Sequence, residues 1–133
     1  MKPEDARVLL ESSKEVQDYL QRAIPALEGL VEPLRGGSSG QPLLILASAA
    51  DGLDGLAQYV ASVQMLVSVG TPQLAENMAG LEQRFAKAIG PMVSGMESQD
   101  SLLVADVLEY ELIPVLQELE SVVDGLLSQS NSH

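Results

Sequence analysis

The chain has 133 residues, 46% of them hydrophobic and none of them cysteine, so one domain with an ordinary apolar core is expected, and disulfides and thiolate metal sites are excluded. The net charge of −12 repels phosphate backbones and argues against nucleic-acid binding. Only four rings, Phe85, Tyr19, Tyr59 and Tyr110, are available, which is too few for a base-stacking platform and indicates an aliphatic core.

Three breaks divide the chain into four segments. The first is the glycine- and serine-rich run at 35–41. The second is Gly-Thr-Pro at 70–72, whose threonine can cap a helix that begins with the proline, and the third offers Asp100 or Ser101 as an N-cap. The resulting segments run over about 3–34, 42–69, 72–97 and 101–128, and we expect a disordered tail at 129–133.

Each segment carries apolar residues at alternating spacings of three and four, the pattern of one helix face packed in a core. The four seams are Leu9, Ser13, Val16, Leu20, Ala23, Leu27, Leu30 and Leu34; Leu46, Ala49, Leu53, Leu56, Val60, Val63 and Val67; Leu74, Met78, Leu81, Phe85, Ala88 and Met92; and Leu108, Leu112, Val115, Leu119, Val122 and Leu126. Only Ser13 interrupts them. The pattern predicts an all-α fold, an antiparallel up-down-up-down four-helix bundle in a single domain at 1–133. A three-helix arrangement with the fourth helix exchanged into a partner is the alternative.

The second segment is apolar nearly all round, since Asp51 and Asp54 are its only charges between Pro42 and Gly70. This pattern predicts either the most buried helix or a second apolar face that contacts another copy, as in a homodimer. Two acids within the segment disfavour a membrane span, and the acidic surface disfavours membrane binding. Because no basic stretch followed by an apolar run begins the sequence, we expect a cytoplasmic protein.

Three prolines, Pro25, Pro91 and Pro114, fall inside predicted helices. Each removes an intrahelical hydrogen bond and crowds the preceding turn, so kinks or breaks are expected there. The similar contexts of Pro25 and Pro91 also raise a duplicated helical hairpin as an alternative.

The inventory of catalytic groups is nearly empty. The only histidine, His133, is the last residue, and no Glu-x-x-His pair, P-loop or Ser-x-x-Lys arrangement is present. We therefore predict no enzyme, no cofactor and no metal, with an all-carboxylate metal cluster as the remaining alternative.

Two surfaces are candidate sites for a protein partner. On the fourth segment, Asp106, Tyr110, Glu118 and Asp124 fall on the polar side, where they could form an acidic patch with an aromatic anchor or a plain solvated face. No lysine or arginine follows Lys87, so this patch would favour basic partners.

The second surface is the end of the third segment. Met92 and Met96 flank a region with Pro91 and two glycines, and Met65 and Met78 could extend it. Flexible thioethers beside a helix irregularity can form an adaptable apolar groove, although they also serve as ordinary core filling.

The run EYELIPVL at 109–116 resembles a segment found in small acidic helical proteins of Firmicutes-type bacteria that remain uncharacterised. This resemblance implies a bacterial, all-α protein and carries no activity. In size and helix count the chain is also similar to flagellar and other export chaperones of the helical-bundle kind. We therefore expect a non-enzymatic protein–protein interaction module that binds a partner or a second copy, with an export chaperone holding a client's amphipathic helix as the alternative, and an enzymatic or metal-binding bundle as a further one.

Overall fold

A computed structural model of the protein describes residues 3–37, 40–67 and 72–131. The elements are α1 (Pro3–Arg35), α2 (Gly40–Val67), α3 (Pro72–Glu97), α4 (Ser101–Val107), the π-helical turn η1 (Leu108–Leu112) and α5 (Ile113–Asn131). Because α4, η1 and α5 follow each other without a break, they form one long fourth helix. The prediction of an all-α protein with four helices is confirmed, and these three ranges contain no strand.

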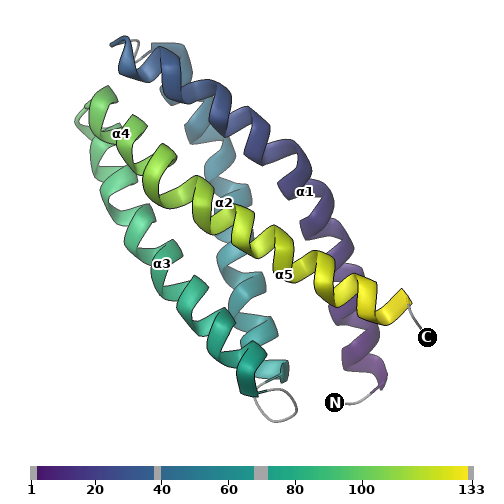
Figure 1. Cartoon of the computed structure of the whole chain (residues 1–133). Helices are drawn as coiled ribbons and strands as arrows, with labels where there is room; N and C mark the ends of the chain where they lie inside the picture. Colours follow the sequence, from purple (N-terminus) through teal and green to yellow (C-terminus); the bar gives the residue numbers. More distant parts are fainter. Residues whose placement is uncertain (1–2, 38–39, 68–71, 132–133) are drawn as a thin grey trace.

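The helices pack along their lengths (Figure 1). The end of α1, the start of α2 and the α3–α4 turn lie at one end of the molecule, whereas the start of α1, the end of α2, the start of α3 and the end of α5 lie at the other. The main contacts pair α2 with α3 and α1 with α5, while α4 contacts both α1 and α3. The fourth helix crosses the front of the molecule in this view.

The helix boundaries follow the predicted breaks closely. After α1, Gly37 takes a φ of +91° and its N–H donates to the Leu34 carbonyl, a left-handed ending that favours glycine. Helix α2 begins at Gly40, two residues before the predicted start, and α3 begins at Pro72 as predicted. The predicted capping residue before Pro72, Thr71, lies outside the described residues.

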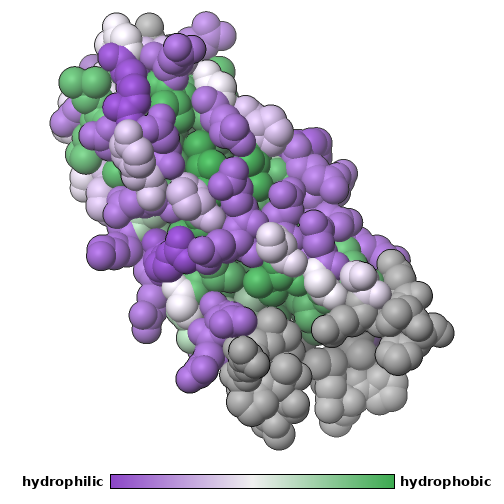
Figure 2. Space-filling view, in the orientation of Figure 1, coloured by the Kyte–Doolittle hydropathy of each residue, from purple (hydrophilic) through white to green (hydrophobic). Residues whose placement is uncertain are grey.

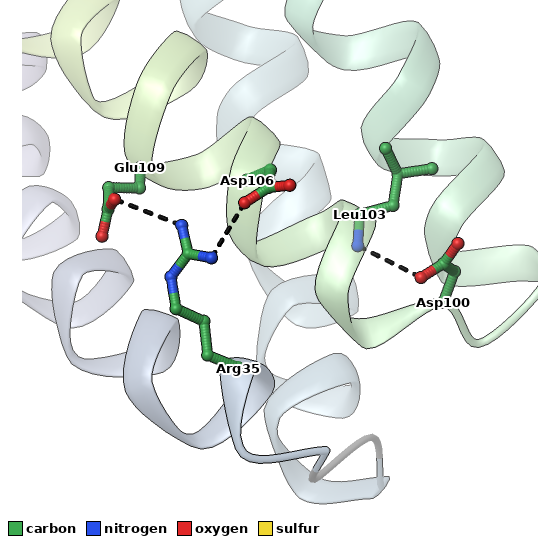
Figure 3. Close-up of polar contacts among 5 residues, drawn as sticks. All are labelled: Arg35, Asp100, Leu103, Asp106 and Glu109. Carbon is green, nitrogen blue, oxygen red and sulfur yellow. Dashed lines mark hydrogen bonds and ion pairs between the residues drawn. The ribbon is translucent and has the colours of Figure 1, made fainter.

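The turn between α3 and α4 is closed by hydrogen bonds on both sides. Gln99 takes a φ of 56°, its N–H donates to the Met96 carbonyl, and the Asp100 N–H donates to the Gly95 carbonyl at 2.8 Å. The Asp100 carboxylate then accepts from the Leu103 N–H at 3.1 Å (Figure 3). Of the two predicted N-caps, Asp100 therefore caps the fourth helix.

The core is mostly aliphatic and comes from all four helices, and in the first three helices it follows most of the predicted seam. Its most deeply buried members there include Leu20, Leu34, Leu46, Val63 and Met78. Outside the core, hydrophilic residues cover much of the face in Figure 2, and hydrophobic residues show between them.

The fourth helix departs from its predicted seam near its end. Val123 and Leu127 are buried, whereas the predicted Val122 and Leu126 are only half-buried. The shift follows the π-helical turn, whose extra residue rotates the later part of the helix about its axis. Val115 and Leu119, just after the turn, stay buried as predicted, and only the last two positions change.

Pro114 accounts for the position of this wide turn. In a regular α-helix its ring would clash with the carbonyl of Tyr110. Here the Ile113 N–H donates instead to the Leu108 carbonyl, five residues back, which widens the turn just before the proline. Helices α1 and α3 continue without a break through Pro25 and Pro91, so a break is wrong at these two positions; the bends predicted there stay predictions.

Two further expectations concern the chain's surface and end. Helix α5 extends to Asn131, past the predicted helix end at about 128, and the disordered tail expected at 129–133 stays a prediction. Residues 132–133, including His133, lie outside the described part of the chain. No helix in the described part is long and apolar enough to cross a membrane.

Candidate functional site

An apolar groove of about 610 Å³ runs between α2 and α3. Its lining comes from both helices and consists of Leu53, Asp54, Ala57, Val60, Glu82, Phe85, Ala86, Ile89, Gly90, Met92 and Val93. Four of these residues, Leu53, Val60, Phe85 and Met92, also belong to the buried core, so the floor of the groove is the outer edge of that core. The floor is therefore fixed by packing that the fold already requires.

The walls of the groove are made of small and exposed side chains. Ala86 and Gly90 are exposed on α3, and Ala57 is half-buried on α2. Val93 lies on the wall with 42% of its surface exposed, which makes it one of the few large apolar side chains of the described chain that face solvent. Such walls allow the backbone of an incoming segment to approach closely.

Helix α2 also exposes apolar side chains outside the groove. Its inner face is buried, but Leu44 is 71% exposed and Ile45 is 43% exposed on the other side. Helix α2 is therefore not buried all round, although it carries only two acids. Neither residue lines the groove, and Ile45 lies beside residues of α1.

The two methionines proposed from the sequence take different positions. Met92 is buried and lines the groove, whereas Met96 is half-buried, packs against the core and is not part of the groove lining. Met78 is fully buried in the core. The side chain of Met65 lies outside the described residues. Met92 is thus the methionine that connects the predicted site with the observed groove.

The acidic side chains at the start of the fourth helix are bound to α1. The Arg35 guanidinium lies 2.9 Å from the Asp106 carboxylate and 3.2 Å from the Glu109 carboxylate (Figure 3). The hydrogen bond to Asp106 raises the pKa of Arg35 further above its ordinary value. Its position in the last turn of α1 also suits the negative end of the helix dipole. Arg35 therefore links the end of α1 to α4 and η1.

Tyr110 lies beside this cluster and is 67% exposed. The Arg35 guanidinium carbon lies 5.6 Å from the centre of its ring, within the range of a cation–π contact. A hydrogen bond with Glu109 is the main cause that raises the pKa of the Tyr110 hydroxyl. The ring is accessible, but its cationic partner already comes from α1.

The remaining two residues of the predicted acidic patch face different helices. Glu118 pairs with Arg84 of α3 at 2.5 Å, and Asp124 accepts a hydrogen bond from Gln17 of α1 at 2.6 Å. The structure thus brings Asp106 and Tyr110 together but places Glu118 and Asp124 on separate flanks. As residues that bind a partner, all four stay predictions.

A buried polar pair joins α1 to α2. Ser13, the one polar residue in the first predicted seam, is fully buried, and its hydroxyl lies 2.6 Å from the hydroxyl of Tyr59. Burial is the main cause that raises the pKa of Tyr59. The interruption at Ser13 was a visible signal in the sequence, but its partner lies 46 residues away.

No group of three or more histidine, cysteine, aspartate or glutamate side chains within the described ranges is close enough together to hold a metal ion. The inward carboxylate cluster that a metal-binding bundle requires is therefore not formed by these residues.

The four helices and the groove define an all-α domain with a predominantly apolar groove on its surface. The model of the family described as "Domain of unknown function (DUF8042)" matches residues 11–122, and the chain belongs to this family. The family description assigns no activity. The comparisons with curated proteins and with solved structures gave no match.

Proposed function

We propose that the protein is a non-enzymatic interaction module that binds an apolar segment of a protein partner in the α2–α3 groove. The groove itself is the observation that carries this proposal, because it combines a floor from the core with walls of small side chains. A solvent-facing apolar groove between two helices is a common binding site for a helix of a partner protein.

The acidic fourth helix is a second contact surface in this proposal. Tyr110 would supply an exposed ring, and the neighbouring carboxylates would favour a basic partner. Met92 contributes from within the groove, whereas Met96 packs against the core outside the groove lining.

Further features of the proposal rest on the sequence. They are a cytoplasmic location, a bacterial origin and an up-down-up-down bundle with bends at Pro25 and Pro91. An export chaperone is the narrower alternative, in which the bound segment is the helix of a secreted client. It predicts that the captured partner is an exported protein.

Site-directed photo-cross-linking tests the proposal directly. The chain has no cysteine, so Val93→Cys introduces a single thiol on the groove wall that can carry a benzophenone label. Leu102→Cys is the matched control, because Leu102 is also an exposed apolar residue but does not line the groove. Labelled protein is introduced into host cells, irradiated, and its adducts are identified by mass spectrometry.

We expect one discrete protein adduct at Val93 and none of it at Leu102. Adding Ala86→Trp, which fills the groove from an exposed wall position, should abolish that adduct. An identical adduct pattern at both positions, or one that Ala86→Trp leaves unchanged, would refute the groove as the binding site. An adduct between two copies of the chain would identify self-association as the function of this surface.

A further inference from the structure

The rim of the α2–α3 groove carries negative charge only. Asp54 of α2 and Glu82 of α3 line the groove, both are exposed, and no lysine or arginine is among the lining residues. The nearby Arg84 of α3 is already paired with Glu118, and Lys87 lies outside the lining. A ligand in the groove therefore meets an apolar floor bordered by carboxylates from both helices.

The dimensions of the groove suit a helix. Along α3 the lining extends from Glu82 to Val93, which at about 1.5 Å per residue corresponds to a length of about 16 Å. That length accommodates about three turns of a helix, enough for apolar anchors at positions i, i+3 or i+4, and i+7. The small side chains Ala57, Ala86 and Gly90 leave room for the anchors and for a close backbone approach.

Charge argues against a second copy of this chain as the occupant. Each copy carries a net charge of −12, and neither α2 nor any residue after Lys87 offers a lysine or arginine. Two copies that meet at this groove would bring like charges together, which is costly at an interface. The rim is complementary to a basic ligand instead.

We propose that the groove binds a basic amphipathic helix of another protein, whose apolar side chains occupy the floor and whose lysines or arginines contact Asp54 and Glu82. This inference rests on the proposed function and adds the chemistry of the partner. Contacts between exposed charges contribute modestly to affinity but strongly to the choice of partner and to the association rate.

Two synthetic helices serve as probes. Each has about 14 residues with leucines at helical spacing, and the remaining positions are lysine in one and glutamate in the other. Binding is followed by fluorescence anisotropy of a dye on the peptide, at low and at high salt. We expect the leucine–lysine helix to bind, with an affinity that falls as salt rises, and the leucine–glutamate helix not to bind.

Matched variants separate local from overall charge. Asp54→Asn with Glu82→Gln removes two charges from the rim, and we expect affinity for the leucine–lysine helix to fall roughly fivefold. Glu11→Gln with Glu15→Gln removes the same two charges from exposed positions on α1 and should change affinity less than about twofold. Ala86→Trp should abolish binding, and far-UV circular dichroism checks that each variant is folded.

Several results would overturn the inference. Equal losses in the two charge variants would mean that the peptide responds to overall charge rather than to the rim. If the two probes bind equally and Ala86→Trp abolishes the binding of both, the preference for a basic partner is refuted but the proposed function is not. Failure of Ala86→Trp to affect either probe, or light scattering that shows a dimer formed through this groove, would also refute it.

Discussion

The buried hydrogen bond between Ser13 and Tyr59 gives the sharpest test of the packing between α1 and α2. The two hydroxyls are 2.6 Å apart, Ser13 is fully buried and Tyr59 is 7% exposed. In Ser13→Ala, the Tyr59 hydroxyl stays buried without its partner, so we expect a loss of about 2 kcal/mol in the free energy of unfolding. In Tyr59→Phe, the Ser13 hydroxyl can turn to a backbone carbonyl one turn earlier, which limits the loss to about 1 kcal/mol.

The double variant distinguishes this pair from two independent effects. With both hydroxyls gone, no polar group is left unpaired there, and the combined loss should be smaller than the sum of the single losses by about 1.5 kcal/mol. Urea unfolding followed by far-UV circular dichroism measures all four proteins, with unchanged m-values as the check on two-state behaviour. Tyr110→Phe, on an exposed ring, is the control and should change stability little. Losses that add to within about 0.3 kcal/mol would refute the coupling.

Two further predictions use the same unfolding assay. A Cβ on Gly95 would lie 2.8 Å from a methyl carbon of the buried Val104, so Gly95→Ala should lower the free energy of unfolding by about 1–2 kcal/mol despite the better helix propensity of alanine. Gly80 has open space around it, so Gly80→Ala should raise the free energy of unfolding by up to about 1 kcal/mol. Equal effects of the two substitutions would contradict the close approach at Gly95. Burial raises the pKa of Tyr59, so its contribution to stability is complete below the unfolded-state pKa of about 10 and is lost as pH rises through the folded-state pKa. Stability should therefore decline above about pH 10, and less steeply in Tyr59→Phe; an unchanged slope in that variant would contradict this cause.

Much of the helical framework could be predicted because its signals are local. The glycine run after Arg35, the proline at position 72 and the carboxylate of Asp100 each act within a few residues, and they set the helix ends. The seams of the first three helices likewise depend only on helical spacing.

The π-helical turn could not be predicted from local sequence signals. Pro114 predicts a disturbance, but a kink, a break and a wide turn all relieve its steric clash. The choice depends on which alternative keeps the later side chains in the core, and the wide turn moves Val123 and Leu127 there in place of Val122 and Leu126.

The site was only partly predictable for a related reason. Met92 was identified from its position beside Pro91 and two glycines, but the groove also needs Leu53 and Val60 from another helix at a particular separation. The ion pair between Arg35 and Asp106 joins distant parts of the chain, and sequence periodicity does not specify such partners. The lack of charge on α2 was a second signal in the sequence, besides Met92, that drew attention to α2 and α3.

The pairing of helices has a consequence for the order of folding. The α2–α3 pair is a hairpin of neighbouring helices, whereas the α1–α5 pair joins opposite ends of the chain and closes a loop of most of its length. Loop closure costs more entropy as the loop grows, and contacts distant in sequence form more slowly. The α2–α3 hairpin therefore costs less loop-closure entropy to form than the α1–α5 pair. Because the groove lies entirely within this hairpin, the proposed binding surface is built from contacts between helices that are neighbours in the sequence.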